Sequence, residues 1–478
     1  MDEANIYKNR WPILIVTIAM TFMSCLDASI VNVALPDMTQ KLHVDTSSIS
    51  WVITIYLIVI VAFIIFFGKL SDLTGKSWVF RMGMLLFIFG SLGCGLANSL
   101  PLLLAARVVQ AVGAAASMST NQGIIAKVFP QGERGRALGI SGASVALGNM
   151  AGPVVGGFIV SFLSWHYIFL INIPIGIVFV ALGLKFLPRD SEKLHDKKAL
   201  DIPGFISFAP AMILIFSSIS YIGVAGDVNF WTLTALGLGL ALFIGFIFWE
   251  RIVEKPMLDL SIFKDRLFSL SILCAFLCFA GMLGTTFLLP FYIQNLLGLS
   301  PHVCGLILMA SPLVLVVVAP LSGHTSDKIG SEMLTFIGLA IMGAGLAAMG
   351  IFYNKGTTVW LIVVIIGLTS LGNGMFQSPN TSLIMSHVGR DKLGVAGSVN
   401  GLVRNTGMAA GVTVAAILLY SMMSAKLGYR VLTYSSAQQD NAFVYAFHIT
   451  MLVLAGITLL GAVLTGIRLL RRRRLGEE

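Results

Sequence analysis

Two charged side chains fall inside long apolar stretches of this chain, where they could take part in proton chemistry. Asp27 lies in the first such stretch and Arg107 in the fourth, and of the 22 acidic residues only Asp27 is assigned a position deep within a span. An ionised carboxylate in hydrocarbon costs about 2.5–3.5 kcal/mol on insertion scales. Asp27 therefore needs a cationic partner or a proton, and a group that alternates between the two can carry protons.

The depths of these two residues predict that they meet. Asp27 precedes the outer end of the first stretch by nine residues, and Arg107 follows the outer start of the fourth by seven. At 1.5 Å per residue they lie roughly 13 and 10 Å deep. Burial favours the protonated carboxyl and the guanidinium favours the ionised one, so helix movement could load and unload a proton. A permanent structural ion pair is the alternative explanation.

Arg107 also begins a polar stripe on its own predicted helix. Gln110, Ala114, Ser117 and Asn121 follow at offsets of 3, 7, 10 and 14 residues, which keep to one face of an α-helix. We expect this face to border water inside the protein.

A second polar face is predicted late in the chain, where Asn373, Gln377 and Asn380 are spaced to point together toward a cavity. Hydrogen bonds that only join helices are an equally good explanation. The residues expected in a substrate cavity are Asn32, Gln110, Asn121, Asn373, Gln377 and Asn380.

Other chemistries find little support in the sequence. The seven histidines form no cluster with metal-ligand spacing, and no Gly-x-x-x-x-Gly-Lys-Ser/Thr loop for a nucleotide is present. We therefore expect neither an enzyme nor a bound cofactor, and a proton gradient as the energy source. The net charge of +9 comes from scattered loop residues rather than a basic face, so a nucleic-acid partner is not expected.

The elements that position these residues are membrane helices. Hydrophobic residues make up 57% of the chain and charged residues 11%, against about 25% charged in soluble domains. Apolar runs long enough to cross about 30 Å of hydrocarbon recur fourteen times. The predicted spans are 11–36, 49–68, 78–97, 100–126, 137–162, 166–187, 203–223, 230–249, 268–290, 302–323, 333–352, 358–386, 394–421 and 442–467.

The loops predict the orientation of these helices. Alternate loops hold most of the 31 Lys and Arg residues, among them those in 127–136, 185–198, 251–266 and the tail 468–474. Because cytoplasmic loops retain positive charge, both termini are predicted to be cytoplasmic. The expected location is the plasma (inner) membrane of a bacterium, where the protein crosses many times and meets lipid as a monomer.

An internal repeat divides the chain. Gly68, Asp72 and Gly75 recur 255 residues later, as do Gly152 and Gly156, and this shared offset indicates a duplication. Parallel six-helix repeats around a midplane site are typical of transporters. We predict an all-α membrane protein with one six-helix bundle in 1–190, two inserted helices in 191–265 and a second bundle in 266–478.

Four segments resemble a known family. The loop 68–76, the glycine- and proline-rich segment 148–157, and the strings 26–36 and 165–176 are together similar to the major facilitator superfamily, and within it to the fourteen-helix drug:proton antiporters. The resemblance implies the major facilitator fold and multidrug efflux, hence antibiotic resistance, by alternating access. It also favours Asp27 as the coupling carboxylate. Some relatives carry an acidic residue near Arg404 and Asn405 that this chain lacks.

The resemblance also assigns roles to two motifs, although a plain solvated turn and simple helix packing are the alternatives. Lys76 replaces an arginine that is common in the family, which removes bidentate pairing there. The residues implied for the gating loops are Gly68, Asp72, Gly75, Lys76, Gly323, Asp327 and Gly330. Those implied for the antiporter helix are Gly148, Gly152, Pro153, Gly156 and Gly157.

These observations predict a proton-coupled exporter of amphipathic or cationic compounds, with Asp27 as proton carrier and Arg107 as its modulator. A narrow exporter of one metabolite, antibiotic or lipid-like molecule is the alternative, because a fold does not specify a substrate. A non-transporting membrane sensor would leave the carboxylate without an evident use.

Overall fold

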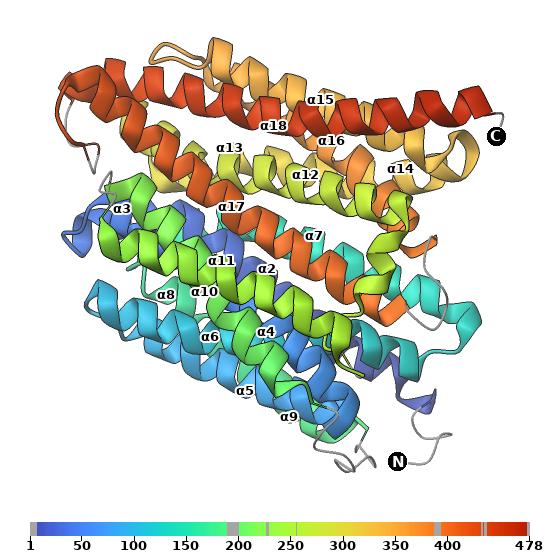
Figure 1. Cartoon of the computed structure of the whole chain (residues 1–478). Coiled ribbons are helices and arrows are strands. Elements are labelled where there is room, and N and C mark those ends of the chain that lie inside the picture. Colours follow the sequence, from blue (N-terminus) through green and yellow to red (C-terminus); the bar gives the residue numbers. More distant parts are fainter. Residues whose placement is uncertain are drawn as a thin grey trace.

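The structure is a computed structural model that describes residues 7–188, 200–225, 229–254, 256–386, 393–431, 434 and 437–475. Throughout these ranges the regular secondary structure is helical, and the long helices run side by side (Figure 1). Both ends of the chain lie at the same end of the helices, which we call the terminal face.

The first half of the chain forms one bundle of six membrane segments. The fifth segment is longer than predicted, and the sixth is broken at Ile171 into two pieces. The elements are α2 (Arg10–Lys41), α3 (Thr46–Ile49), α4 (Trp51–Thr74), α5 (Lys76–Gly95), α6 (Leu100–Val128), α7 (Gln131–Phe162), α8 (Tyr167–Leu170) and α9 (Asn172–Phe186).

Two further helices form a hairpin and lead into the second bundle, which has six membrane segments of its own. The elements are α10 (Ile202–Ala225), α11 (Phe230–Ile252), η2 (Leu260–Lys264), α12 (Arg266–Phe291), η3 (Tyr292–Leu296), α13 (Pro301–Leu308), α14 (Ala310–Ile329), α15 (Ser331–Phe352), α16 (Val359–Ser386), α17 (Leu393–Leu427), η5 (Ala437–Gln439) and α18 (Asp440–Leu475). Within α12, Pro290 removes a backbone donor just before the π-helical turn of η3.

The predicted fold class is confirmed. Thirteen helical segments in the described ranges are long and apolar enough to span a membrane, and α7 supplies the fourteenth although only its part Ala151–Phe162 is strongly apolar. The polar start of α7 explains this difference, since Gln131, Glu133, Arg134 and Arg136 extend the helix beyond hydrocarbon.

The duplication is visible in the backbone. Gly75 has a φ of 107° and Gly330 a φ of 87°, and each donates its N–H over 3.0 Å to the carbonyl four residues earlier, on Ser71 and Ser326. Such positive φ values favour glycine, which lacks a Cβ. The two gating loops therefore make the same tight turn between helices at equivalent positions of the two halves.

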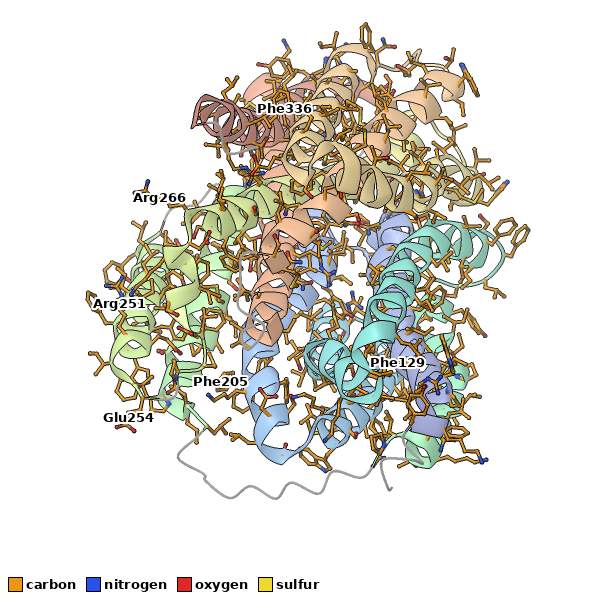
Figure 2. The ribbon with its side chains drawn as sticks, turned by 90° about the vertical axis from the view of Figure 1, so that its right-hand side faces the viewer. Phe129, Phe205, Arg251, Glu254, Arg266 and Phe336 are labelled. Carbon is orange, nitrogen blue, oxygen red and sulfur yellow. The ribbon has the colours of Figure 1, made fainter. Side chains whose placement is uncertain are left out.

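The inserted hairpin packs against both bundles at one side of the molecule, where α10 contacts α4 and α17. Figure 2 looks onto the terminal face, with Arg251 in the last turn of α11 and Glu254 just after that helix. Two buried carboxylates fix the base of the hairpin. Asp201, just before α10, accepts from Nε1 of Trp249 on α11 over 2.8 Å, and Glu250 on α11 accepts from N–H of Leu258 in the segment that follows over 3.0 Å. The insertion is thus an ordered part of the fold.

Candidate functional site

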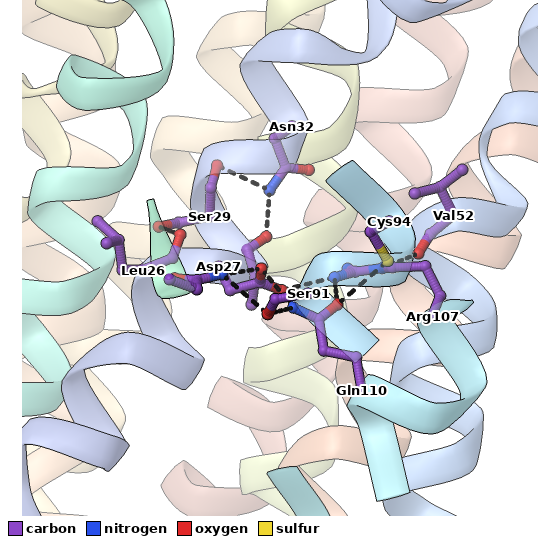
Figure 3. Close-up of polar contacts among 11 residues, drawn as sticks. Leu26, Asp27, Ser29, Asn32, Val52, Ser91, Cys94, Arg107 and Gln110 are labelled. Atoms are coloured by element: carbon purple, nitrogen blue, oxygen red, sulfur yellow. Dashed lines mark hydrogen bonds and ion pairs between the residues drawn. The ribbon is translucent and has the colours of Figure 1, made fainter. Parts of the chain in front are cut away.

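Asp27 lies fully buried on α2 and accepts hydrogen bonds from three side chains (Figure 3). Nη1 of Arg107 lies 2.5 Å from Oδ2, while Nε2 of Gln110 and Nδ2 of Asn172 donate to Oδ1 over 2.8 and 2.9 Å. The carboxyl group therefore has a partner for each of its oxygens, on α6 and α9.

Arg107 is equally buried and has partners beyond Asp27. Its Nη1 also donates to Oε1 of Gln110 over 2.6 Å, and its Nε donates to the carbonyl of Val52 on α4 over 3.1 Å. The guanidinium carbon lies 4.2 Å from the centre of the Tyr56 ring, a cation–π contact. The guanidinium thus connects α2, α4 and α6.

Close helix packing places these groups. A Cβ on Gly90 would lie 2.3 Å from the backbone nitrogen of Gln110, so glycine there lets α5 and α6 approach closely. This approach brings Oγ of Ser91 within 2.8 Å of Nε2 of Gln110. On the other side of Asp27, Asn172 begins α9 and reaches the carboxylate from there.

A cavity lies next to this network, between the two bundles. It has a larger chamber of about 140 Å³ and a smaller one of about 70 Å³, which share lining residues including Tyr56 and Met282. The smaller chamber is nearer the terminal face, because it reaches Ser24 on α2 whereas the larger reaches Asn32. Arg107 lines the larger chamber, and Asp27 lines neither.

Half of the six predicted cavity residues line it. Asn32 and Asn373 border the larger chamber and Gln377 borders the smaller one. The prediction was wrong for Gln110, which bonds to Asp27, and for Asn380, whose Nδ2 donates to the carbonyl of Ser271 on α12 over 3.1 Å.

Asn121 was also wrongly predicted to face the cavity. Its Nδ2 donates to Oγ1 of Thr21 and Oγ of Ser141 over 2.6 and 3.3 Å. The whole stripe from Arg107 to Asn121 is buried against neighbouring helices instead of bordering water. Helical spacing established that these residues share a face, but not which face the neighbours cover.

The first gating loop contains an ion pair within one turn. Nζ of Lys76 donates to Oδ1 of Asp72, and both side chains are partly exposed. Gly68 offers its carbonyl to Oγ of Ser71 over 2.7 Å. In the second loop, a Cβ on Gly323 would meet Oγ of Ser378 on α16 at 2.8 Å, and the side chain of Asp327 lies outside the described part.

The glycines of α7 serve two contacts. A Cβ on Gly148, Gly152 or Gly156 would collide with α2, at 2.7, 1.8 and 2.8 Å from its nearest atoms. On Gly157 it would lie 2.7 Å from the carbonyl of Pro301 in the other bundle. Conversely, a Cβ on Gly305 of α13 would lie 2.3 Å from the carbonyl of Pro153. This segment therefore joins the two bundles at close range.

Comparison with known proteins decides the family. The model of the Major Facilitator Superfamily matches residues 17–412 and 272–477, which together cover most of the chain. The chain belongs to the major facilitator superfamily. It is a multi-pass membrane transporter rather than an enzyme.

Relatives of this major facilitator transporter differ in their recorded cargo. It is 35% identical to the riboflavin transporter RibZ of Clostridioides difficile, over 96% of this chain and 97% of the relative. It is 31% identical to the multidrug resistance protein Stp of Mycobacterium tuberculosis, over 87% and 76%. The peptide transporter POT shares the fold, with a TM-score of 0.67, 16% identity and coverage of 98% and 99%.

Sequence reasoning missed three residues of the transporter's buried network: Ser91, Asn172 and Tyr56. Asn172 stands in the string 165–176 that resembles the family, and this resemblance could have marked it as a candidate site residue. Ser91 and Tyr56 carried no signal, because an isolated hydroxyl in an apolar span is common and its neighbours depend on tertiary packing.

Proposed function

We propose that this transporter exports amphipathic compounds in exchange for protons, with Asp27 as the proton-carrying carboxyl. One observation carries the proposal: Asp27 is buried and held by Arg107, and Arg107 itself borders the cavity between the bundles. A compound in the cavity can thus disturb the guanidinium without touching the carboxylate.

The proposed cycle follows from the charges. When the cavity is empty, Arg107 can turn into it, and Asp27 without its cationic partner then favours its protonated form. A compound that fills the cavity returns the guanidinium to Asp27, which favours loss of that proton, so that compound and proton are bound in alternation. Contact between α7 and α13 at Gly157 and Gly305 closes the bundles against each other on one side, which limits leak. This is the sequence of events that exchange requires.

Orientation belongs to the same proposal. The Lys and Arg bias of the loops supports a cytoplasmic terminal face in a bacterial inner membrane. A proton entering through about 100 mV then contributes roughly 2.3 kcal/mol. We further propose that the transporter works as a monomer without a bound cofactor.

Everted vesicles with an imposed pH gradient test this function. Addition of a transported compound should release protons from vesicles with the wild-type chain but not from those with Asp27→Asn. Asp37→Asn is the matched control, since Asp37 lies on the same helix and pairs with Lys41 one turn away, over 3.0 Å. An equal response from wild type and Asp27→Asn would show that the carboxylate is structural.

A narrow substrate range is the second candidate, and the similarity to riboflavin transporter RibZ along nearly the full chain favours it. The same vesicles distinguish the two. Proton release by several unrelated amphipathic compounds supports multidrug export, whereas release by riboflavin or one other metabolite alone supports a narrow exporter.

A further inference from the structure

Arg404 is a second arginine on a membrane-spanning helix, and it differs from Arg107 in having no counter-ion among the described residues. It lies on α17, 11 residues from the start of that helix at Leu393, or roughly 16 Å at 1.5 Å per residue. Within the described residues, its half-buried guanidinium makes no hydrogen bond or ion pair. An arginine at such depth is costly and ordinarily faces a partner or a functional cavity.

Arg404 lines the smaller chamber together with Ser24 and Tyr56, two residues that carry hydroxyl groups. Oγ of Ser24 and the phenol oxygen of Tyr56 are buried, and neither has a hydrogen-bond partner in the described structure. Buried polar groups are almost always hydrogen-bonded, so two unpaired hydroxyls in the wall that also holds a cation indicate an acceptor that comes from outside the chain. The wall of this chamber thus offers three potential donors to an anionic oxygen group.

The charged residues of the cavity wall also favour an anionic ligand. Among the described residues that line either chamber, the charged ones are Arg107 and Arg404, and none is acidic. The remaining wall is mostly apolar, with flexible methionines such as Met282 and Met408 that adapt to varied shapes. A positive charge would be repelled there, whereas an apolar body with a negative end would fit.

We propose that Arg404, with Tyr56 and Ser24, binds the anionic group of the substrate, so that this transporter carries amphipathic carboxylates and similar organic anions. The inference rests on the proposed export function and names its substrate class. It replaces the expected preference for cations with the opposite one.

Tyr56 gives this site a physical link to the proton site. Tyr56 lines the smaller chamber, and its ring packs against the Arg107 guanidinium that holds Asp27. A carboxylate that binds Arg404 and the Tyr56 hydroxyl would therefore move the Tyr56 ring relative to the Arg107 guanidinium. An outward anion and an inward proton both move positive charge inward, so an inside-negative potential drives both movements.

Binding of three matched probes to the full chain tests the proposal. The probes are 2-naphthylacetate, its neutral amide and 2-naphthylethylammonium, measured by calorimetry in nanodiscs of phosphatidylcholine, which exclude anionic lipid as a competitor. We expect wild type to bind the carboxylate at least about tenfold more tightly than the ammonium. Arg404→Gln should weaken carboxylate binding about tenfold or more and leave amide binding unchanged, and Arg404→Lys should restore part of it.

Amide binding by Arg404→Gln shows that this variant is folded, and Arg430→Gln, on an exposed outer residue, is the matched control for loss of charge. Absence of carboxylate binding, preference for the ammonium, or an unchanged Arg404→Gln would overturn the proposal. Binding needs no gradient, so anion-selective binding without proton release would contradict only the export function. Proton-coupled transport that is the same in wild type and Arg404→Gln would contradict only the anion site.

Discussion

Nη1 of Arg107 lies 2.5 Å from Oδ2 of Asp27, and only the arginine of this pair reaches the cavity wall. The guanidinium is therefore placed to communicate the state of the cavity to a carboxylate that no substrate touches. Removing either member leaves the other as an unpaired buried charge, which typically costs 3–5 kcal/mol.

Arg107→Gln should slow proton release, because the cation that pairs with Asp27 is gone. We expect substrate-driven proton release in vesicles to be slower and its pH profile to differ in shape from that of wild type. Loss of stability alone would lower the rate equally at every pH, and that result would contradict a modulating role.

Asn172→Ala should weaken the hold on the same carboxylate, since Asn172 donates to Oδ1 over 2.9 Å. A hydrogen bond to a charged group contributes about 1.5–3 kcal/mol, so we expect a lower melting temperature and a shifted pH profile of transport. Asn121→Ala is the control, because this buried amide bonds to Thr21 and Ser141. If both variants shift the profile alike, Asn172 has no specific part in coupling.

Gly305→Ala should force the bundles apart at α7 and α13, because the new methyl would lie 2.3 Å from the carbonyl of Pro153. Electron–electron distances between spin labels at the ends of these helices away from the terminal face should lengthen, and transport should slow. Gly456→Ala, on α18 with no atom within 4 Å of its added Cβ, should change neither. Unchanged label distances in Gly305→Ala would show that this contact does not hold the bundles together.

Asp72→Asn should leave stability within about 1 kcal/mol of wild type, because its pair with Lys76 is partly exposed. A gating role predicts that the transport rate nevertheless falls severalfold. The comparison is Asp37→Asn, which breaks another pair one helical turn apart, with Lys41. Equal rates in both variants would indicate a plain solvated turn.

Depth and composition were predictable from the sequence, whereas helix rotation was not. Counting residues from the outer ends of two spans predicted the contact between Asp27 and Arg107, and the distribution of apolar runs predicted fourteen helices. Asn373 and Gln377, grouped by their spacing, border the larger and the smaller chamber, and a role for them in binding stays a prediction. Spacing could not show that Asn121 faces Thr21, because the orientation of a helix in its bundle depends on packing against all its neighbours.

The proposed anion site around Arg404 could not be predicted from the sequence. The position of Arg404 within a span was evident, but the two hydroxyl-bearing residues that share its chamber are Ser24 on α2 and Tyr56 on α4, helices of the other bundle. No spacing rule connects residues so far apart in the chain.

The internal repeat has a consequence for how the two halves have diverged. Applying its offset of 255 residues to Asp27 and Arg107 gives Met282 and Ile362, two apolar side chains in the second half. Applied to Tyr56, it gives Ser311, which lines the same larger chamber. The two halves have thus diverged at these positions: the first half holds the buried ion pair, whereas the second half has uncharged side chains there. If the proposed exchange holds, substitutions at these positions of the second half should alter which compounds are carried and leave the ion pair intact.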